Sequence, residues 1–167
     1  MAVATVISVE EYLRSSYDGD CDFLEGHVVE RNVGELDHSD VQSSCLYYLG
    51  LQYKSYLCGV EVRVQVKPNR FLVPDVTLVS GGKPKGRIIT SPPTLTIEVL
   101  WPDDRAADLQ DRIDDYLAFG VPTVWVINPV SRRAFVYTAD GMREAKGGFL
   151  RTADGVIEMP LTAIFAD

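Results

Sequence analysis

The hydrophobic and polar positions of this chain predict several short strands and a few helices. Strict alternation over residues 60–66 predicts a half-buried strand, and residues 71–79 predict a second one. Residues 94–100 predict a third strand. Residues 123–128 are apolar on both faces, which is typical of a central strand. Apolar positions at three- and four-residue steps predict a long helix that begins near Asp37.

The first thirty residues predict a short helix followed by a hairpin. Ser8 and Glu11 have the spacing of a capping box, so a helix should cover residues 9–15. Residues 21–30 are typical of a hairpin that turns at positions 25–26. This N-terminal hairpin should precede the long helix.

Glycine and proline mark the ends of the longer elements. Gly59 should end the first long helix, and a second long helix that opens at residues 102–104 should stop at Gly120. Residues 134–152 predict a C-terminal β-meander. Without repeats or linkers, the chain predicts one α/β (α+β) domain over residues 1–167, with helices packed on a mixed, curved sheet.

Composition narrows the class of protein further. The 167 residues carry 16 Lys and Arg against 24 Asp and Glu, a net charge of −8, which argues against a polybasic nucleic-acid binder. No apolar run reaches the length of a membrane helix, and the N-terminus has no basic leader. Cys21, Cys45 and Cys58 form neither a zinc pattern nor a disulfide framework. We therefore expect a soluble cytoplasmic protein with no membrane partner.

Two carboxylates occupy unexpected positions in the predicted strands. Glu98 lies inside an apolar strand, and Asp75 lies within the preceding strand. If these strands pair, Asp75, Thr77, Thr96 and Glu98 share one face. Two buried carboxylates are costly, and a divalent cation such as Mg²⁺ or Mn²⁺ would offset that cost.

Structural roles stay open for the same residues. Pro-Asp is a common turn dipeptide, which would account for Asp75, and Glu98 could pair with Arg63 or Arg112. Asp108 and Arg112 are four residues apart on one flank of the second long helix. That flank either faces the two carboxylates or carries a surface ion pair.

Histidine and lysine positions supply further candidates. His38, at the start of the first long helix, could be a metal ligand, a general base, a phosphate contact or a solvated residue. Residues 61–87 carry six basic and two acidic groups although the whole chain is acidic. In this stretch Lys83, Lys85 and Arg87 are candidate phosphate contacts, or else solvated loop residues.

The blocks at residues 73–79, 95–102, 108–116 and 120–129 resemble, in this order, the bacterial Uma2 family of restriction-endonuclease-like proteins. That family belongs to the PD-(D/E)XK nuclease superfamily. The hairpin and His38 agree with it as well, so the resemblance covers nearly the whole chain. It implies a core sheet flanked by helices and a metal site formed by Asp75 and Glu98.

One position departs from the pattern that the resemblance implies. The family has a lysine in the helix after the glutamate, and here that position is Arg112. Arginine stays protonated and cannot act as a base, but it could hold a scissile phosphate. The resemblance implies a Mg²⁺- or Mn²⁺-dependent endonuclease that acts on DNA with Asp75, Glu98 and Arg112. The alternative is a nuclease-like fold that is retained as a binding or oligomerisation module. Exposed strands and C-terminal hairpins favour a homodimer.

Overall fold

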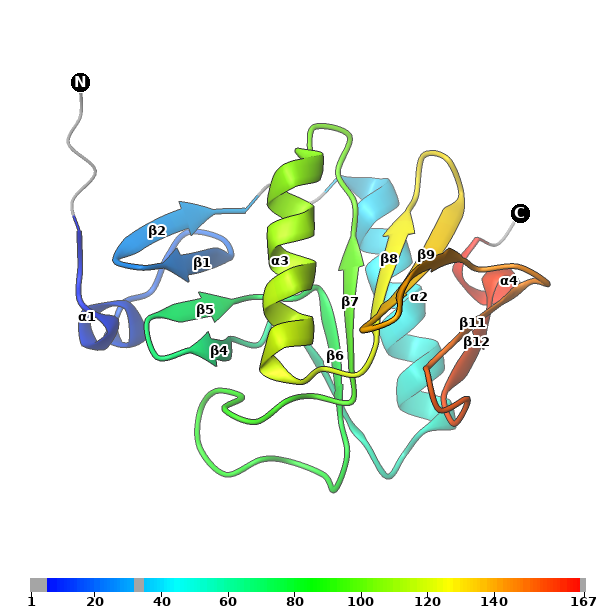
Figure 1. The fold of residues 1–167 in the computed structure, drawn as a ribbon, viewed down its shortest axis with the longest axis horizontal. Helices are drawn as coiled ribbons and strands as arrows, with labels where there is room; N and C mark the ends of the chain where they lie inside the picture. The colour runs from blue at the N-terminus through cyan, green and yellow to red at the C-terminus, as the bar shows by residue number, and fades with distance from the viewer. Residues whose placement is uncertain (1–5, 32–34, 166–167) are drawn as a thin grey trace.

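Three β-sheets and four helices make up the computed structural model, which describes residues 6–31 and 35–165 (Figure 1). The helices are α1 (Val9–Arg14), α2 (Leu36–Gln52), α3 (Ala106–Phe119) and α4 (Leu161–Ile164). The first strands are β1 (Cys21–Leu24), β2 (His27–Glu30), β3 (Leu57–Val60), β4 (Val64–Lys67), β5 (Arg70–Leu72) and β6 (Val76–Val79). The others are β7 (Leu95–Val99), β8 (Val124–Asn128), β9 (Arg133–Thr138), β10 (Gly141–Glu144), β11 (Phe149–Arg151) and β12 (Glu158–Pro160).

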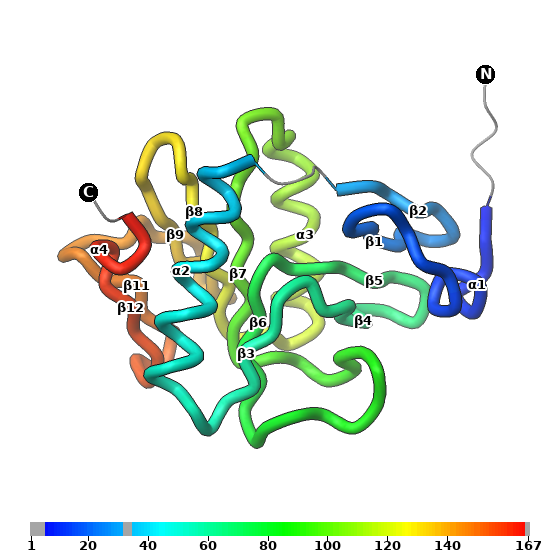
Figure 2. The backbone as a smooth tube through the Cα atoms, turned by 180° about the vertical axis from the view of Figure 1, so that it is seen from behind, coloured from blue at the N-terminus to red at the C-terminus, as the bar shows by residue number. Residues whose placement is uncertain are grey.

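A six-stranded mixed sheet forms the centre, in the order β10-β9-β8-β7-β6-β3. Strands β7 and β8 run parallel, and their neighbours run antiparallel. Helix α3 covers one face and α2 the other, as the views from the two sides show (Figures 1 and 2). Alternate residues of the central strands are buried under each helix, such as Ile97 beneath α2 and Val126 beneath α3. This confirms the predicted sheet flanked by helices.

A second sheet lies beside the first and contains the N-terminal hairpin. Its order is β2-β1-β5-β4, all antiparallel, and α1 packs on it through the rings of Tyr12, Phe23 and Phe71. Glu25 and Gly26 have positive φ angles of 53° and 97° and form the predicted turn. The predicted hairpin is confirmed, but its pairing with β5 was not anticipated.

Both of the long predicted strands are divided between the two sheets. The alternating run 60–66 breaks at Glu61, whose φ is 52°, so β3 joins the six-stranded sheet and β4 the four-stranded one. The run 71–79 breaks at residues 74–75 between β5 and β6. Proline cannot donate to a ladder, which favours a break there. The prediction that Gly59 ends α2 is wrong. Helix α2 ends at Gln52, and Gly59 lies within β3.

Two more boundaries differ from the sequence prediction. Helix α3 begins at Ala106, after a turn in which the Asp104 side chain accepts from the backbone N–H of Trp101, and it ends at Gly120 as predicted. The prediction of a C-terminal meander is only partly confirmed. Strands β9 and β10 continue the central sheet, whereas β11 pairs with β12 in a separate two-stranded sheet. Within residues 6–31 and 35–165, no helix is both long and apolar enough to cross a membrane.

Candidate active site at the junction of the two sheets

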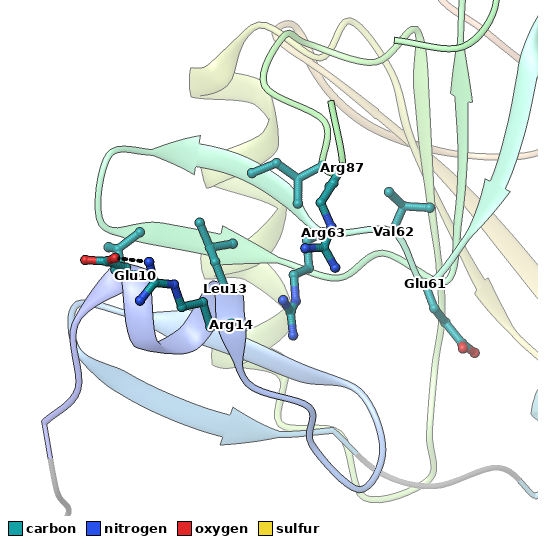
Figure 3. A pocket seen from close by; sticks show the side chains of 9 residues that line it. Glu10, Leu13, Arg14, Glu61, Val62, Arg63 and Arg87 are labelled. Carbon is teal, nitrogen blue, oxygen red and sulfur yellow. Dashed lines mark ion pairs between the residues drawn. The ribbon is translucent and has the colours of Figure 1, made fainter. Parts of the chain in front are cut away.

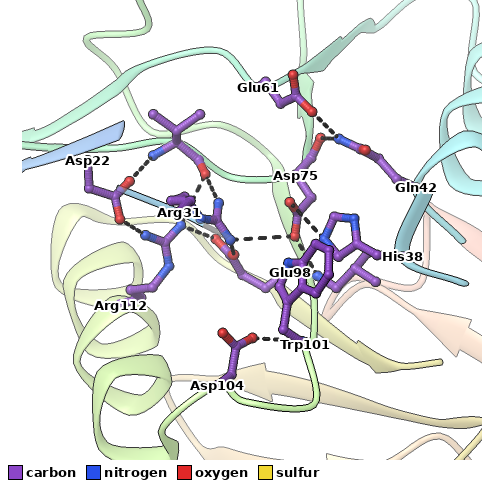
Figure 4. A network of polar contacts seen from close by, with 12 residues as sticks. Asp22, Arg31, His38, Gln42, Glu61, Asp75, Glu98, Trp101, Asp104 and Arg112 are labelled. Carbon is purple, nitrogen blue, oxygen red and sulfur yellow. Dashed lines mark hydrogen bonds and ion pairs between the residues drawn. The ribbon is translucent and has the colours of Figure 1, made fainter. Parts of the chain in front are cut away.

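Asp75 and Glu98 lie together because of the register between β6 and β7. Val76 pairs with Ile97 and Thr77 with Thr96, so the next position on each strand brings the two carboxylates face to face. Both are buried, at 4% and 2% exposure. The predicted convergence of these side chains is confirmed, and Figure 4 shows them at the centre of a polar network.

Asp75 is held in its ionised form by its surroundings. The backbone N–H of Val99 donates to Oδ2 at 2.6 Å, and Nε2 of His38 lies 3.3 Å from Oδ1. Burial alone would raise the pKa of Asp75, but His38, Arg31 and the Val99 amide outweigh burial and lower it. Asp75 is therefore a carboxylate near neutral pH.

Glu98 accepts hydrogen bonds on both of its oxygens. Oε1 accepts from Nη2 of Arg112 and from the hydroxyl of Tyr116, each at 2.8 Å. Oε2 accepts from Nη2 of Arg31 at 3.0 Å. Burial, and then the charge of Glu98, raise the pKa of Tyr116 well above its ordinary value, so this hydroxyl keeps its proton. Glu98 is thus held in one orientation by two cations and one neutral donor.

Arg112 reaches Glu98 from α3, as one of the sequence alternatives proposed. The same guanidinium donates to Asp22 and, at 3.1 Å, to the carbonyl oxygen of Val73. Burial acts against the charge of Arg112, but Glu98 above all raises its pKa well above the ordinary value. The surface-pair alternative is wrong, because Asp108 is exposed and the ion pairs of Arg112 are with Asp22 and Glu98.

Arg31 and Asp22 complete the network and were missed by the sequence analysis. Both come from the N-terminal hairpin region, and Asp22 also accepts from the Val73 amide at 2.8 Å. Nη2 of Arg31 lies 3.0 Å from Glu98 Oε2 and 3.7 Å from Asp75 Oδ2, so it is shared by the two carboxylates. No local pattern marks these residues, because the hairpin reaches the site through the long-range pairing of β1 with β5.

His38 is buried in the site, which overturns the solvated alternative. It is 7% exposed, and its ring stacks on the indole of Trp101 with centroids 4.6 Å apart and planes 20° from parallel. Its Nε2 faces Asp75 without the geometry of a hydrogen bond, and this nitrogen has no hydrogen-bond partner within the described part of the chain. His38 is therefore a buried neighbour of Asp75, and its role as a phosphate contact, metal ligand or general base stays a prediction.

A further pair of carboxyl groups, Asp20 and Glu61, lies next to Asp75. Gln42 donates at 3.0 Å both to Glu61 and to the carbonyl oxygen of Asp75. Burial, and then the negative charge of Glu61, raise the pKa of Asp20 to about 6. The surroundings of Asp75 thus include a carboxyl that takes up a proton in mildly acidic solution.

The structure does not bring the predicted basic residues to the carboxylates. Lys83 and Lys85 lie in the loop between β6 and β7, at the opposite end of these strands from Asp75 and Glu98 (Figure 1). Arg87 follows them and, with Arg14 and Arg63, lines a cavity of about 790 Å³ beside α1 (Figure 3). Their role as phosphate contacts stays a prediction.

The donor chemistry of the site fits a hard cation. Asp75 and Glu98 offer carboxylate oxygens to one shared point, which Nη2 of Arg31 approaches, and such oxygens are the ligands that Mg²⁺ and Mn²⁺ prefer. Among residues 6–31 and 35–165, no group of three or more His, Cys, Asp or Glu side chains is arranged to hold a metal ion. Two carboxylates would therefore hold such an ion, in competition with Arg31.

Comparison with known proteins agrees with the observed fold. The Uma2 family model, described as "Putative restriction endonuclease", matches residues 9–161. A crystal structure of "a putative nuclease belonging to DUF820" from Anabaena variabilis ATCC 29413 superposes with a TM-score of 0.79. It shares 19% sequence identity over 95% of this chain and 97% of that chain, so the likeness concerns the fold. No curated protein matches the sequence.

Proposed function

The chain belongs to the Uma2 family of restriction-endonuclease-like proteins, and from this premise we propose that it is a Mg²⁺-dependent endonuclease that hydrolyses DNA phosphodiester bonds. The observation that carries the proposal is the shared approach of Asp75 and Glu98 to one cationic nitrogen, at 3.7 and 3.0 Å. Paired carboxylates at neighbouring strands are suited to hold a divalent ion against a phosphate.

The charge balance of the network supports this substrate. Asp22, Asp75 and Glu98 contribute three negative charges, and Arg31 and Arg112 contribute two positive ones. The network is therefore left with one negative charge when the imidazole of the site is neutral. A divalent cation together with one phosphodiester group adds one positive charge, so the loaded site would be electrically balanced. Buried charges are tolerated when they are balanced in this way.

The chemistry of hydrolysis would be divided between the ion and the two arginines. Asp75 and Glu98 would hold the ion, which would supply Lewis-acid activation of water and of the phosphate. Arg112 stays protonated and cannot remove a proton, but its fork can bind a phosphate oxygen and stabilise negative charge that develops there. Tyr116, by donating to Glu98, keeps that carboxylate oriented.

Cleavage of supercoiled plasmid DNA tests the proposal. The wild-type protein should convert the plasmid to nicked or linear forms with Mg²⁺ or Mn²⁺, and EDTA should stop the reaction. Asp75→Asn and Glu98→Gln should each abolish cleavage. Asp140→Asn, an exposed carboxylate in the turn between β9 and β10, is the matched control and should cleave normally. Cleavage that survives in Asp75→Asn would refute the assignment of the site.

A binding or oligomerisation module is the second candidate function. The observation that favours it is Arg112, whose two terminal nitrogens already donate to Asp22, Glu98 and the Val73 carbonyl. If the wild-type protein has no nuclease activity and Arg112→Lys creates it, the natural chain is a binding module. If the wild-type protein cleaves DNA, the binding-module candidate is refuted.

Two further expectations from the sequence stay predictions. We expect a homodimer, which light scattering of the purified chain tests directly. We also expect a cytoplasmic location, in keeping with the free thiols of Cys21, Cys45 and Cys58 in the structure. Localisation of a tagged chain would test this.

A further inference from the structure

A second hollow lies beside the carboxylate site, at the C-terminal ends of the parallel strands β7 and β8. Its volume is about 390 Å³, within the range of pockets that hold small planar ligands. The walls are mainly apolar, and the polar side chains that line them are Asn128, at the end of β8, and the charged Asp104 and Arg105. The apolar lining residues that matter here are Leu100, Trp101, Pro102, Leu109 and Val130.

This hollow adjoins the pocket that holds the charged network. A pocket of about 220 Å³ is lined by Arg31, Glu98 and Arg112 and shares Trp101 and Leu109 with the larger one. A ligand that places a phosphate at the arginines would therefore extend its next group toward Trp101. The two pockets together have the layout of a phosphate site with an adjoining apolar site.

Trp101 is fixed in place and partly exposed, as a stacking surface should be. Its indole stacks on His38, and its backbone N–H donates to Asp104 Oδ2 at 2.8 Å. The other tryptophan, Trp125, is 0% exposed in the core. Trp101 therefore offers an aromatic ring to a ligand, and Trp125 serves as an internal reference that no ligand reaches.

Asn128 gives the hollow a polar end that suits the edge of a nucleobase. Its Oδ1 accepts from the backbone N–H of Ser131 at 2.9 Å, which fixes the side chain. Its amide nitrogen makes no hydrogen bond within residues 6–31 and 35–165. A fixed amide donor next to a tryptophan can recognise the edge of a base while its face stacks on the ring.

We infer that this hollow binds an unpaired nucleobase next to the scissile phosphate, so that the preferred substrate is single-stranded or locally unpaired DNA. A base within a duplex has its faces stacked and its edge paired, and it cannot enter such a pocket. The inference rests on the proposed action on DNA and names the class of DNA.

The charge around the pocket agrees with a single strand. Asp103, Asp104 and Asp108 are exposed around the two pockets, against one exposed cation among the lining residues, Arg105. Phosphates of a second strand would meet these carboxylates, and repulsion between like charges disfavours the duplex. A single strand that is held by stacking needs fewer phosphate contacts.

Binding in the absence of metal tests the inference separately from cleavage. In EDTA, a fluorescein-labelled single-stranded oligonucleotide should bind more tightly than the same sequence as a duplex, by fluorescence anisotropy. Trp101→Ala should weaken single-strand binding by about 5- to 150-fold, and Trp101→Phe should retain most of it, because base stacking contributes on this scale. Circular dichroism confirms that each variant is folded.

Two further readouts do not depend on whether the Trp101→Ala variant folds. Val130→Asp alters an exposed pocket wall and should weaken binding, whereas Val156→Asp makes the same change at a similarly exposed valine in the turn between β11 and β12 and should not. Unlabelled single-stranded DNA should also quench tryptophan emission in the wild-type protein but not in Trp101→Phe, where only Trp125 remains.

The outcomes separate this inference from the proposed nuclease activity. Binding that depends on Trp101 without any cleavage in Mg²⁺ would support the base pocket and overturn the proposed function. Asp75-dependent cleavage that is equal on duplex and single strand, and unchanged in Trp101→Ala, would overturn the base pocket alone. Equal effects of Val130→Asp and Val156→Asp would also overturn it.

Discussion

Removal of the Arg112 guanidinium should destabilise the fold as well as the site. Arg112→Met keeps much of the side-chain length and removes the charge that Glu98 and Asp22 share. Those carboxylates are only 3% and 7% exposed, so water cannot replace the lost partner. The variant would therefore bury negative charge without sufficient compensation.

The magnitude follows from the cost of breaking a buried ion pair. Loss of one partner costs about 3–5 kcal/mol, and Arg112 belongs to this class because its side chain is 12% exposed. For a chain of this size, each kcal/mol lowers the Tm by roughly 2–4 °C, which predicts a fall of roughly 6–20 °C. Arg112→Lys keeps the charge but loses the paired N–H donors of the guanidinium, and it should lower the free energy of unfolding by about 1–2 kcal/mol.

Urea denaturation in EDTA, followed by circular dichroism, measures these differences. Arg133→Met is the control, because Arg133 forms an exposed ion pair with Glu144 and its loss should leave the midpoint unchanged. The expected order of stability is wild type and control, then Arg112→Lys, then Arg112→Met. An Arg112→Met variant as stable as the wild type would refute the view that the arginine neutralises the buried carboxylates.

Three further changes have defined outcomes. The pKa of Asp20 is raised from 3.8 to about 6 by burial and by Glu61, so the stability that its proton contributes is present below about pH 4 and is lost as the pH rises through about 6. Asp20→Asn should accordingly be more stable than the wild type at neutral pH and equal to it near pH 4 by urea titration; the same difference at both pH values would contradict this. Tyr116→Phe removes the donor to Glu98 at 2.8 Å and should cost about 1.5–3 kcal/mol in the same assay, and an unchanged midpoint would show that the bond contributes nothing. Gly120→Ala forces a side chain into φ 106° at the end of α3 and should lower stability by about 1–2 kcal/mol, with an unshifted Tm as the opposing result.

The sequence predicted the centre of the site because local patterns encode it. Alternation assigned Asp75 and Glu98 to one face of two adjacent strands, and the antiparallel pairing of Thr77 with Thr96 confirms that assignment. The family resemblance placed Arg112 on the next helix, facing the same point. These inferences needed the strand period, the helix period, the chain order and, for Arg112, the family resemblance.

The rest of the network depends on contacts that no local pattern encodes. Asp22 and Arg31 reach the site because β1 pairs with β5, a contact between segments about fifty residues apart. Alternation continues through Glu61 although the backbone turns there, since a positive φ leaves the order of polar and apolar residues unchanged. The sequence left the role of His38 open, because a first-turn helix position can be solvated or face a site, and its burial follows from Trp101 lying against it.

Calorimetric titration of Mn²⁺ into the metal-free protein tests the central claim most directly. The account predicts one bound ion per chain, loss of binding in Asp75→Asn and in Glu98→Gln, and normal binding in Asp140→Asn. Tighter binding is expected in Arg31→Met, because Arg31 approaches both carboxylates and competes with the ion. The account would be contradicted by the absence of any Mn²⁺ binding, or by binding that is unchanged when Asp75 is replaced.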